Sequence, residues 1–249
     1  MNEQFDLSIV IPAYTEEKRI GATLDKLAEY LRQHNFGRVE VIVAHARPPQ
    51  ADKTLEIARE KATLFDHLEP LDLGPKKEGE GKGSHVKRAV LGAKGKYILF
   101  MDADLATPLS YIETAYNEAK AGEKVLICSR DVTSSHKGIR KLISWGGNIL
   151  VQALLLPGVR DTQCGFKLFE REAAHKLFSK QTIIGWTFDM EILALAKKYG
   201  YKIKQIEVND WKDVAGGTFT PSTGAAVASL KDLFRIKWNI ISRKYDQKP

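Results

Sequence analysis

The chain has 249 residues, 43% of them hydrophobic, which is enough to bury the core of one large α/β domain. Its formal net charge of +7 favours anionic partners such as nucleotides, nucleic acid or an acidic lipid surface. Cys128 and Cys164 are too few for a disulfide framework and lack metal-site spacing, so we expect a reducing compartment. The N-terminus has no signal pattern, and no apolar run approaches the roughly 20 residues that span a bilayer, so we expect no membrane crossing.

The first third of the chain alternates short apolar runs with amphipathic segments. Residues 7–11 and 39–43 are short, mostly apolar runs that predict buried strands, whereas residues 17–33 and 53–63 carry apolar residues at helical spacing. This order of strands and helices predicts a right-handed parallel sheet with helices on its faces. Residues 72–85 are rich in glycine and charge, and we expect them to form a mobile loop.

Glycines at the end of that loop suggest phosphate binding. Gly81, Lys82 and Gly83 precede a helix predicted over residues 86–93 and resemble a phosphate cradle, although the spacing differs from that of a P-loop. A solvated basic loop explains the same residues equally well. Both interpretations stay open at this stage.

Two carboxylates follow a buried strand predicted at residues 97–101. Asp102 and Asp104 lie in the stretch GKYILFMDADLATP, residues 95–108. In open α/β sheets, ligands bind outside the carboxyl ends of the strands. Two aspartates at this spacing can face one hard cation and leave room for water and diphosphate oxygens. Alternatively, they only form a turn and cap the helix that begins near Pro108.

The second half contains the most hydrophobic predicted helix, residues 138–156, whose basic start includes Arg140. Such a helix either lies in a membrane interface or packs in the core. A basic, amphipathic helix is predicted over residues 225–243, after a loop that contains Gly216 and Gly217. The other predicted elements are helices at 109–121, 171–178 and 188–199, strands at 124–128, 166–169 and 201–208, and a polar loop at 129–137.

Four stretches together resemble the inverting family 2 glycosyltransferases of the GT-A fold. They are SIVIPAYTEE at 8–17, GKGSHVKRAVLGAKGKYILFMDADLATP at 81–108, DTQCGFKLFEREAA at 161–174, and FDMEILALAKKYGYKI with the later VNDW at 188–211. Within that family they are most similar to polyprenyl-phosphate (dolichyl-phosphate) glucose and mannose synthases, and DTQCGFK and FDMEIL lean toward the glucosyl branch. The resemblance implies one α/β domain with a Rossmann-like, mostly parallel sheet and helices on both faces. It assigns residues 1–128 to the nucleotide sugar and residues 129–249 to the acceptor.

The resemblance also implies roles for individual residues. The candidate catalytic residues are Asp102, Asp104, Asp161, Gln163 and Asp189. The candidate donor-binding residues are Pro12, Ala13, Glu16, Glu17, Lys82, Asp102 and Arg130, and we add His45, which lies where the chain departs from the family pattern. The candidate acceptor and loop residues are Arg140, Glu191 and Trp211. Asp104 and Asp102 are the expected ligands of Mg²⁺ or Mn²⁺, with Asp104 as the stronger one.

Several of these residues have a simpler structural role that stays open. Asp161 and Asp189 are also suited to capping a turn or a helix. Gln163 can serve a local backbone hydrogen bond, and Trp211 can be a packing residue. Glu191 can be a solvated residue that complements the dipole of its helix.

One segment departs from the family pattern. The second strand of these enzymes usually ends in a turn of the type VDDGSxDxT, whose acidic residues hold the base and ribose. Here Val43 continues into AHARPPQADKT, in which only Asp52 and Thr54 are retained. His45 stands where a carboxylate is expected, and we predict that it hydrogen-bonds the base.

The favoured hypothesis is a metal-dependent, inverting enzyme that moves a hexose, most simply glucose, from a nucleotide sugar to a polyprenyl phosphate. UDP-glucose is the favoured donor and GDP-mannose the alternative. We expect a cytoplasmic protein docked peripherally on an anionic membrane surface. A transferase with a soluble glycan or metabolite acceptor, and a non-catalytic member that binds a membrane or partner, are the alternatives. We expect no nucleic-acid partner, since no aromatic and basic recognition motif accompanies the charge.

Overall fold

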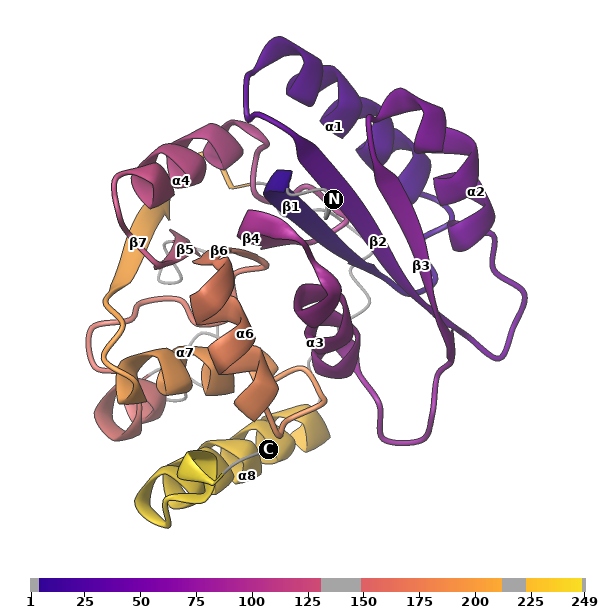
Figure 1. The fold of residues 1–249 in the computed structure, drawn as a ribbon. Helices are drawn as coiled ribbons and strands as arrows, with labels where there is room; N and C mark the ends of the chain where they lie inside the picture. Colours follow the sequence, from indigo (N-terminus) through magenta and orange to yellow (C-terminus); the bar gives the residue numbers. More distant parts are fainter. Residues whose placement is uncertain (1–4, 131–148, 212–222, 248–249) are drawn as a thin grey trace.

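The strands of the described residues form one seven-stranded sheet (Figure 1). The computed structural model describes residues 5–130, 149–211 and 223–247. The strands are β1 (Phe5–Ala13), β2 (Val39–Arg47), β3 (Leu68–Pro75), β4 (Gly95–Met101), β5 (Val125–Arg130), β6 (Phe166–Glu170) and β7 (Ile203–Val208), in the order β3-β2-β1-β4-β6-β5-β7. Among these strands, β6 runs antiparallel to its neighbours β4 and β5, and all other pairs are parallel. The predicted mostly parallel α/β sheet is confirmed.

Helices cover both faces of this sheet, as Figure 1 shows. The helices are α1 (Ile20–Gln33), α2 (Thr54–Glu60), α3 (Lys82–Gly92), α4 (Ser110–Lys120), α6 (Arg171–Lys180), α7 (Phe188–Lys198) and α8 (Thr223–Ile241), with short 3₁₀ turns at Lys61–Leu64 and Lys244–Asp246. On one face α1 and α4 bury Leu24 and Ile112 against Leu99 of β4. On the other, α3, α6 and α7 pack against Phe100. Because residues 97–101 of β4 are buried on both faces, their sequence is a continuous apolar run rather than an alternating one.

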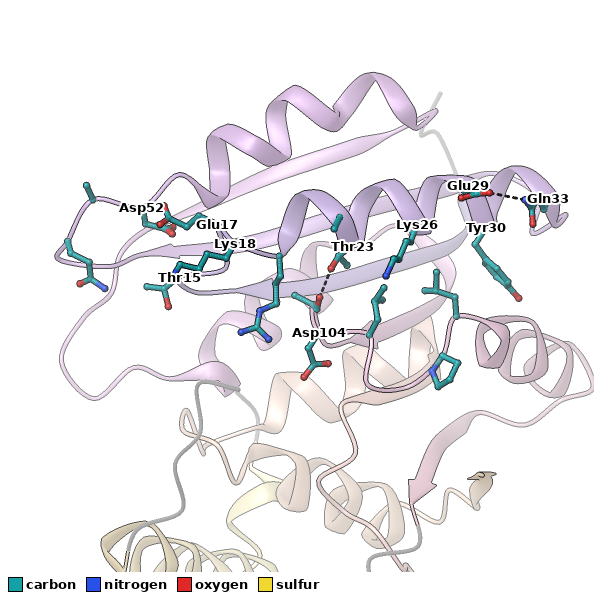
Figure 2. A pocket seen from close by; sticks show the side chains of 18 residues that line it. Thr15, Glu17, Lys18, Thr23, Lys26, Glu29, Tyr30, Gln33, Asp52 and Asp104 are labelled. Carbon is teal, nitrogen blue, oxygen red and sulfur yellow. Dashed lines mark hydrogen bonds between the residues drawn. The ribbon is translucent and has the colours of Figure 1, made fainter. Parts of the chain in front are cut away.

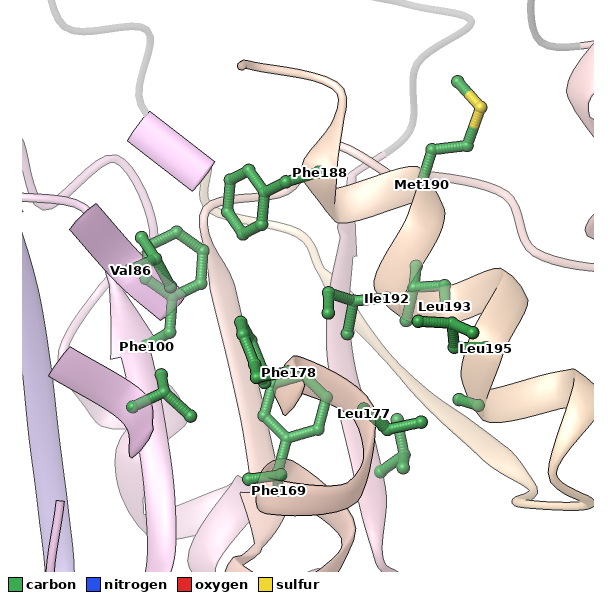
Figure 3. Close-up of a cluster of buried hydrophobic side chains, with 14 of the residues drawn as sticks. Val86, Phe100, Phe169, Leu177, Phe178, Phe188, Met190, Ile192, Leu193 and Leu195 are labelled. Carbon is green, nitrogen blue, oxygen red and sulfur yellow. The ribbon is translucent and has the colours of Figure 1, made fainter. Parts of the chain in front are cut away.

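The core on the α3 side is rich in aromatic rings (Figure 3). Phe100 and Phe188 meet edge to face with their centroids 5.9 Å apart, and Phe169 and Phe178 do so at 5.6 Å. This geometry suits the quadrupoles of the rings. It anchors the start of α7 against β4, the strand that ends at the two aspartates.

Three predicted boundaries are corrected. Residues 68–75 form β3, so the loop predicted over 72–85 begins with a strand. This strand is interrupted by Glu69, Pro70 and Asp72 and lies at an edge of the sheet, where little burial is required of it. Helix α3 starts at Lys82 rather than residue 86. Helix α1 starts at Ile20, because the segment before it is held in a turn in which the Glu16 carbonyl accepts the amides of Arg19 and Ile20.

Four predictions fall wholly or largely outside the described residues, and one of them is the polar loop predicted over 129–137, of which only Ser129 and Arg130 are described, at the end of β5. Of the hydrophobic helix predicted over 138–156, residues 149–154 are described and are helical. Arg140 and the glycine-rich loop at 216–217 lie outside the description. Among the described residues, no helix has the length and apolar character needed to cross a membrane.

Candidate active site

The carboxyl ends of β1, β2 and β4 lie at the same edge of the sheet, since these strands are parallel. Asp102 and Asp104 follow β4 at this edge. The Asp102 amide donates to the Gly165 carbonyl at 2.9 Å, and a Cβ atom on Gly165 would overlap the carboxylate of Asp102. Gly165 is therefore required for the close approach of the DTQCGFK segment to the aspartate loop. On the other side, the Thr23 hydroxyl donates to the Ala103 carbonyl at 2.6 Å and fixes the loop to α1.

Three carboxylates share this edge electrostatically. Burial raises the pKa of Asp104, and the neighbouring charge of Asp102 raises it further. Burial also raises the pKa of Glu16 to about 6, although Arg19 at 2.6 Å opposes the shift and both aspartates add to it. Such a concentration of partly buried negative charge favours a bound cation.

The residues fit a hard divalent cation with an open coordination sphere. Asp102 and Asp104 supply carboxylate oxygens, the ligand type that Mg²⁺ and Mn²⁺ prefer. Within the described ranges, no three His, Cys, Asp or Glu side chains are grouped closely enough to enclose a metal. A cation held by two aspartates would therefore complete its coordination with water and substrate oxygens.

Lys82 lies beside the aspartates. Its Nζ donates to Asp102 Oδ1 at 2.5 Å and lies 5.0 Å from the centroid of the Phe100 ring and 5.4 Å from that of Trp186. Burial acts to lower the pKa of Lys82, but the charges of Asp102 and Asp189 outweigh it and the net shift is upward. The side chain is therefore a fixed ammonium ion at the carboxyl end of β4.

The glycines beside Lys82 pack against the segment before α7. The amide of Gly83 donates to the Gly185 carbonyl at 3.2 Å, and that of Ser84 donates to the Ile184 carbonyl at 3.1 Å. A Cβ atom on Gly83 would lie 2.7 Å from the Gly185 oxygen. Because these amides already have acceptors, the predicted phosphate cradle is wrong for them.

Asp189 is buried beneath this site and pairs with a lysine that the sequence reasoning missed. Lys167 Nζ lies 2.6 Å from Asp189 Oδ1 and donates to the Cys164 carbonyl at 2.5 Å. The side chains of Lys167 and Asp189 are only 1% and 6% exposed. Burial raises the pKa of Asp189, while Lys167 and Lys82 oppose the shift. The pair therefore supports both Lys82 and the DTQCGFK turn from inside.

Arg130, Asp161 and Trp211 form a second cluster. Arg130 Nε donates to Asp161 Oδ2 at 2.6 Å, and the guanidinium lies 4.6 Å from the centroid of the Trp211 ring. Asp161 Oδ1 also accepts the amide of Gln163 at 3.1 Å. The turn-capping alternative for Asp161 is thus present, together with an ion pair that orients the arginine.

The segment after β2 is tied to the segment after β1. His45 is 2% exposed, and its Nε2 lies 2.8 Å from Asp52 Oδ2. Asp52 Oδ1 accepts the Thr54 hydroxyl at 2.9 Å, and Thr54 Oγ1 accepts the amide of Glu16 at 2.9 Å. The retained Asp52 and Thr54 therefore hold the predicted donor-binding segment that follows Pro12 and Ala13.

Two further predicted residues, Glu17 and Glu191, form hydrogen bonds that hold separate segments of the chain together. Glu17 Oε2 accepts the amide of Lys53 at 3.1 Å and so joins the same two segments. Glu191 is fully buried, and its carboxylate accepts hydrogen bonds from Thr182, Ile183 and Tyr245. It holds together α7, the segment before it and the C-terminal turn. The solvated alternative for Glu191 is wrong.

A groove of about 1140 Å³ opens beside Asp104 (Figure 2). It runs along α1 from Thr15 to Gln33, and Figure 2 shows Asp104 facing it from the side opposite the helix. Arg19 and Lys26 also line it. The groove thus runs from the aspartate edge over a surface of mixed charge, which also carries Glu17, Glu29 and Asp52.

A sequence model of the family described as Glycosyl transferase family 2 matches residues 8–178. The chain belongs to this family. It is 31% identical to a dolichyl-phosphate beta-glucosyltransferase of Dictyostelium discoideum over 250 residues, which cover 94% of this chain and 75% of that protein. A human protein of the same name is 31% identical over 232 residues, with 86% and 70% covered. The chain is therefore a glycosyltransferase by family, as the sequence motifs predicted.

Solved structures of related shape support the same fold. Glucosyl-3-phosphoglycerate synthase from Mycobacterium tuberculosis in complex with uridine diphosphate has a TM-score of 0.68 at 16% identity, covering 95% of this chain and 80% of that one. The same enzyme with Mn²⁺, UDP-glucose and phosphoglyceric acid has a TM-score of 0.66 at 16% identity, with 95% and 79% covered. Mannosyl-3-phosphoglycerate synthase from Rubrobacter xylanophilus has a TM-score of 0.68 at 14% identity, with 98% and 76% covered. The GT-A fold is confirmed.

Proposed function

We propose that this protein transfers glucose from UDP-glucose to dolichyl phosphate or a related polyprenyl phosphate, with inversion to a β-linked product. The observation that carries the proposal is the grouping of Lys82, Asp102 and Asp104 at the carboxyl end of β4. Relatives named dolichyl-phosphate beta-glucosyltransferase support the choice of sugar and acceptor. Residues 1–128 then hold the donor, and residues 129–249 face the acceptor.

The transfer is one displacement at C1 of the glucose. An anionic oxygen of the acceptor phosphate forms the new bond to C1, while the bond from C1 to the diphosphate oxygen breaks and its electron pair leaves with UDP. A phosphate monoester is largely deprotonated at neutral pH, with a second pKa of about 6, so the nucleophile needs no general base. Asp102 and Asp104 would hold Mg²⁺ or Mn²⁺, which neutralises charge developing on the diphosphate.

Fixed cations of the chain supply the rest of the stabilisation. The Lys82 ammonium is already in place beside Asp102, and the Arg130 guanidinium is oriented by Asp161 and Trp211. Preorganised charges of this kind lower a barrier without reorganising during the reaction. We assign Lys82 to the donor diphosphate and Arg130 to the phosphate of either substrate.

We also propose that the protein docks on the cytoplasmic face of an anionic membrane through α8. Five apolar side chains at helical spacing are exposed along this helix: Val227, Leu230, Phe234, Trp238 and Ile241. Trp238 is 68% exposed, although the opposite side of the helix buries Leu233 and Ile236. Lys231, Arg235, Arg243 and Lys244 are exposed on or just after the same helix. An apolar stripe with basic neighbours fits the headgroup region of acidic lipids.

Calorimetric titration tests the donor and the metal. UDP-glucose and GDP-mannose are titrated into the wild type and into Asp104→Asn, each with and without Mn²⁺. We expect metal-dependent binding of UDP-glucose that is weakened at least about tenfold in the variant, which corresponds to about 1.4 kcal/mol. Binding of neither donor, or binding that ignores both metal and variant, would contradict the proposal.

Transfer and docking need separate measurements. We expect the wild type to form β-glucosyl dolichyl phosphate, and NMR of the anomeric proton to identify the linkage. An α-linked product would exclude the inverting displacement, and transfer only to a soluble glycan would favour the other acceptor class. For docking, Trp238→Ala should reduce co-flotation with vesicles that contain phosphatidylserine. Equal flotation of both proteins would remove α8 as the docking surface.

A further inference from the structure

The segment between α6 and α7, residues 181–187, lies directly against the start of α3. The Ile184 and Gly185 carbonyls accept the amides of Ser84 and Gly83, and neither Gly81 nor Gly83 has room for a Cβ atom without displacing this backbone. The contact joins two parts of the chain that are about 100 residues apart. It fixes the next residue, Trp186, beside Lys82.

Trp186 is a large apolar side chain at the border of a charged site. Its ring centroid lies 5.4 Å from Lys82 Nζ, and that ammonium is 2.5 Å from Asp102. Trp186 and Ile184 are nevertheless 44% and 42% exposed. An indole offers a broad apolar surface on a stiff side chain, which suits it to bind a flexible hydrocarbon. Trp186 does not line the groove along α1.

The same segment leads away from the charged site toward α8. The Thr187 hydroxyl donates to the Asp232 carboxylate of that helix. The N-terminal half of α8 carries the exposed Val227 and Leu230. A lipid phosphate that reacts beside Lys82 would thus place its hydrocarbon tail against apolar side chains.

We propose that Trp186, with Ile184, forms the binding site for the first isoprene units of a prenyl phosphate acceptor, and that the chain continues from there toward α8. This inference rests on the proposed function, because it assigns a residue contact to that acceptor. It separates the acceptor from the donor in space, with the prenyl group on the Trp186 side of Lys82 and the groove along α1 on the Asp104 side. Trp186 is thereby a specificity-determining residue for a lipid phosphate over a phosphate that lacks a tail.

Binding of a short, water-soluble prenyl phosphate tests this without a membrane. Geranyl phosphate and inorganic phosphate are titrated into the full chain in the presence of UDP and Mn²⁺, for the wild type, Trp186→Ala and Trp186→Phe. Truncation of a tryptophan anchor should weaken geranyl phosphate binding at least about tenfold, whereas phosphate binding stays the same. Trp186→Phe, which keeps an aromatic ring, should restore most of the lost affinity. UDP-glucose affinity should not change in either variant.

A second indole provides the matched control for Trp186. Trp238→Ala removes an exposed indole elsewhere on the surface and should reduce vesicle flotation but not geranyl phosphate binding. If Trp186→Ala weakens phosphate and geranyl phosphate equally, or weakens UDP-glucose, the residue supports Lys82 and the inference is overturned. Unchanged geranyl phosphate binding in Trp186→Ala also overturns it. If the wild type binds UDP-glucose but not geranyl phosphate, the proposed acceptor class itself is wrong.

Discussion

Replacing Lys167 by methionine should destabilise the protein strongly, because it leaves the Asp189 carboxylate buried in the core without the lysine that it pairs with. Lys167 and Asp189 are almost fully buried, and their charged atoms are 2.6 Å apart. Removal of one partner of a buried ion pair typically costs about 3–5 kcal/mol. For a chain of this size, 1 kcal/mol shifts the melting temperature by about 2–4 °C, so we expect a decrease of roughly 6–20 °C. Urea and thermal unfolding of Lys167→Met measure the two quantities.

The double variant Lys167→Met with Asp189→Leu is the decisive control. It removes both charges and keeps apolar volume, so its stability should return to within about 2 kcal/mol of the wild type. The penalty of the single variant should also be larger at pH 8 than at pH 5. Burial raises the pKa of Asp189, and loss of Lys167 should raise it further. The folded variant then keeps a proton on Asp189 that the unfolded chain releases, so the variant loses stability as the pH rises. A penalty below about 1 kcal/mol, or additive losses in the double variant, would refute the reasoning.

Two further predictions concern a glycine pair and a pH dependence. Gly83→Ala should lower the free energy of unfolding by about 1–3 kcal/mol, because the added Cβ would lie 2.7 Å from Phe188 Cβ. Gly92→Ala, at the open end of the same helix, should raise it by about 0.5–1 kcal/mol. Equal melting temperatures for the two variants would contradict this. The pKa of Glu16 is about 6, above its unfolded value of 4.5, so the folded state binds more protons between these values and stability falls as the pH rises through 6. Between pH 5 and pH 8 the free energy of unfolding of the wild type should fall by about 1 kcal/mol relative to that of Glu16→Gln, after allowance for partial exposure and for the ion pair with Arg19. Urea unfolding of both proteins at the two pH values measures this. A difference in midpoint that is the same at both pH values would rule it out.

The central strands could be predicted because their signals are local. Residues 97–101 are apolar without interruption and residues 7–11 are apolar except for Ser8, and the structure buries them on both faces as β4 and β1. The position of Asp102 and Asp104 follows from the end of such a strand. The edge strand β3 could not be predicted in this way. It pairs with β2 alone and its other edge is unpaired, so its sequence does not need to be an apolar run. Local composition cannot distinguish a polar edge strand from a loop.

Lys167 and Trp186 are residues of the candidate site whose positions could not be predicted from sequence spacing. Lys167 follows Phe166 in DTQCGFK, and nothing in this motif indicates that the lysine is 1% exposed, since its burial depends on an aspartate 22 residues later. Lysine is almost never fully buried without a partner, so the sequence favours the exposed interpretation. The position of Trp186 could not be predicted either, because a backbone contact between segments about 100 residues apart sets it beside Lys82.

The glycines of the candidate site illustrate why motif chemistry and packing are hard to separate from sequence. Gly83 and Gly165 both lie in motifs that resemble ligand-binding loops, yet each admits another segment of the chain at a distance that a Cβ atom would forbid. Gly165 lets the acceptor-side turn approach Asp102, and Gly83 lets the segment before α7 approach Lys82. A glycine that admits a phosphate and one that admits a backbone are identical in sequence, because both only remove a side chain. In this chain the close contact of two distant segments at Gly83 brings Lys82 to the exposed indole that we assign to the acceptor.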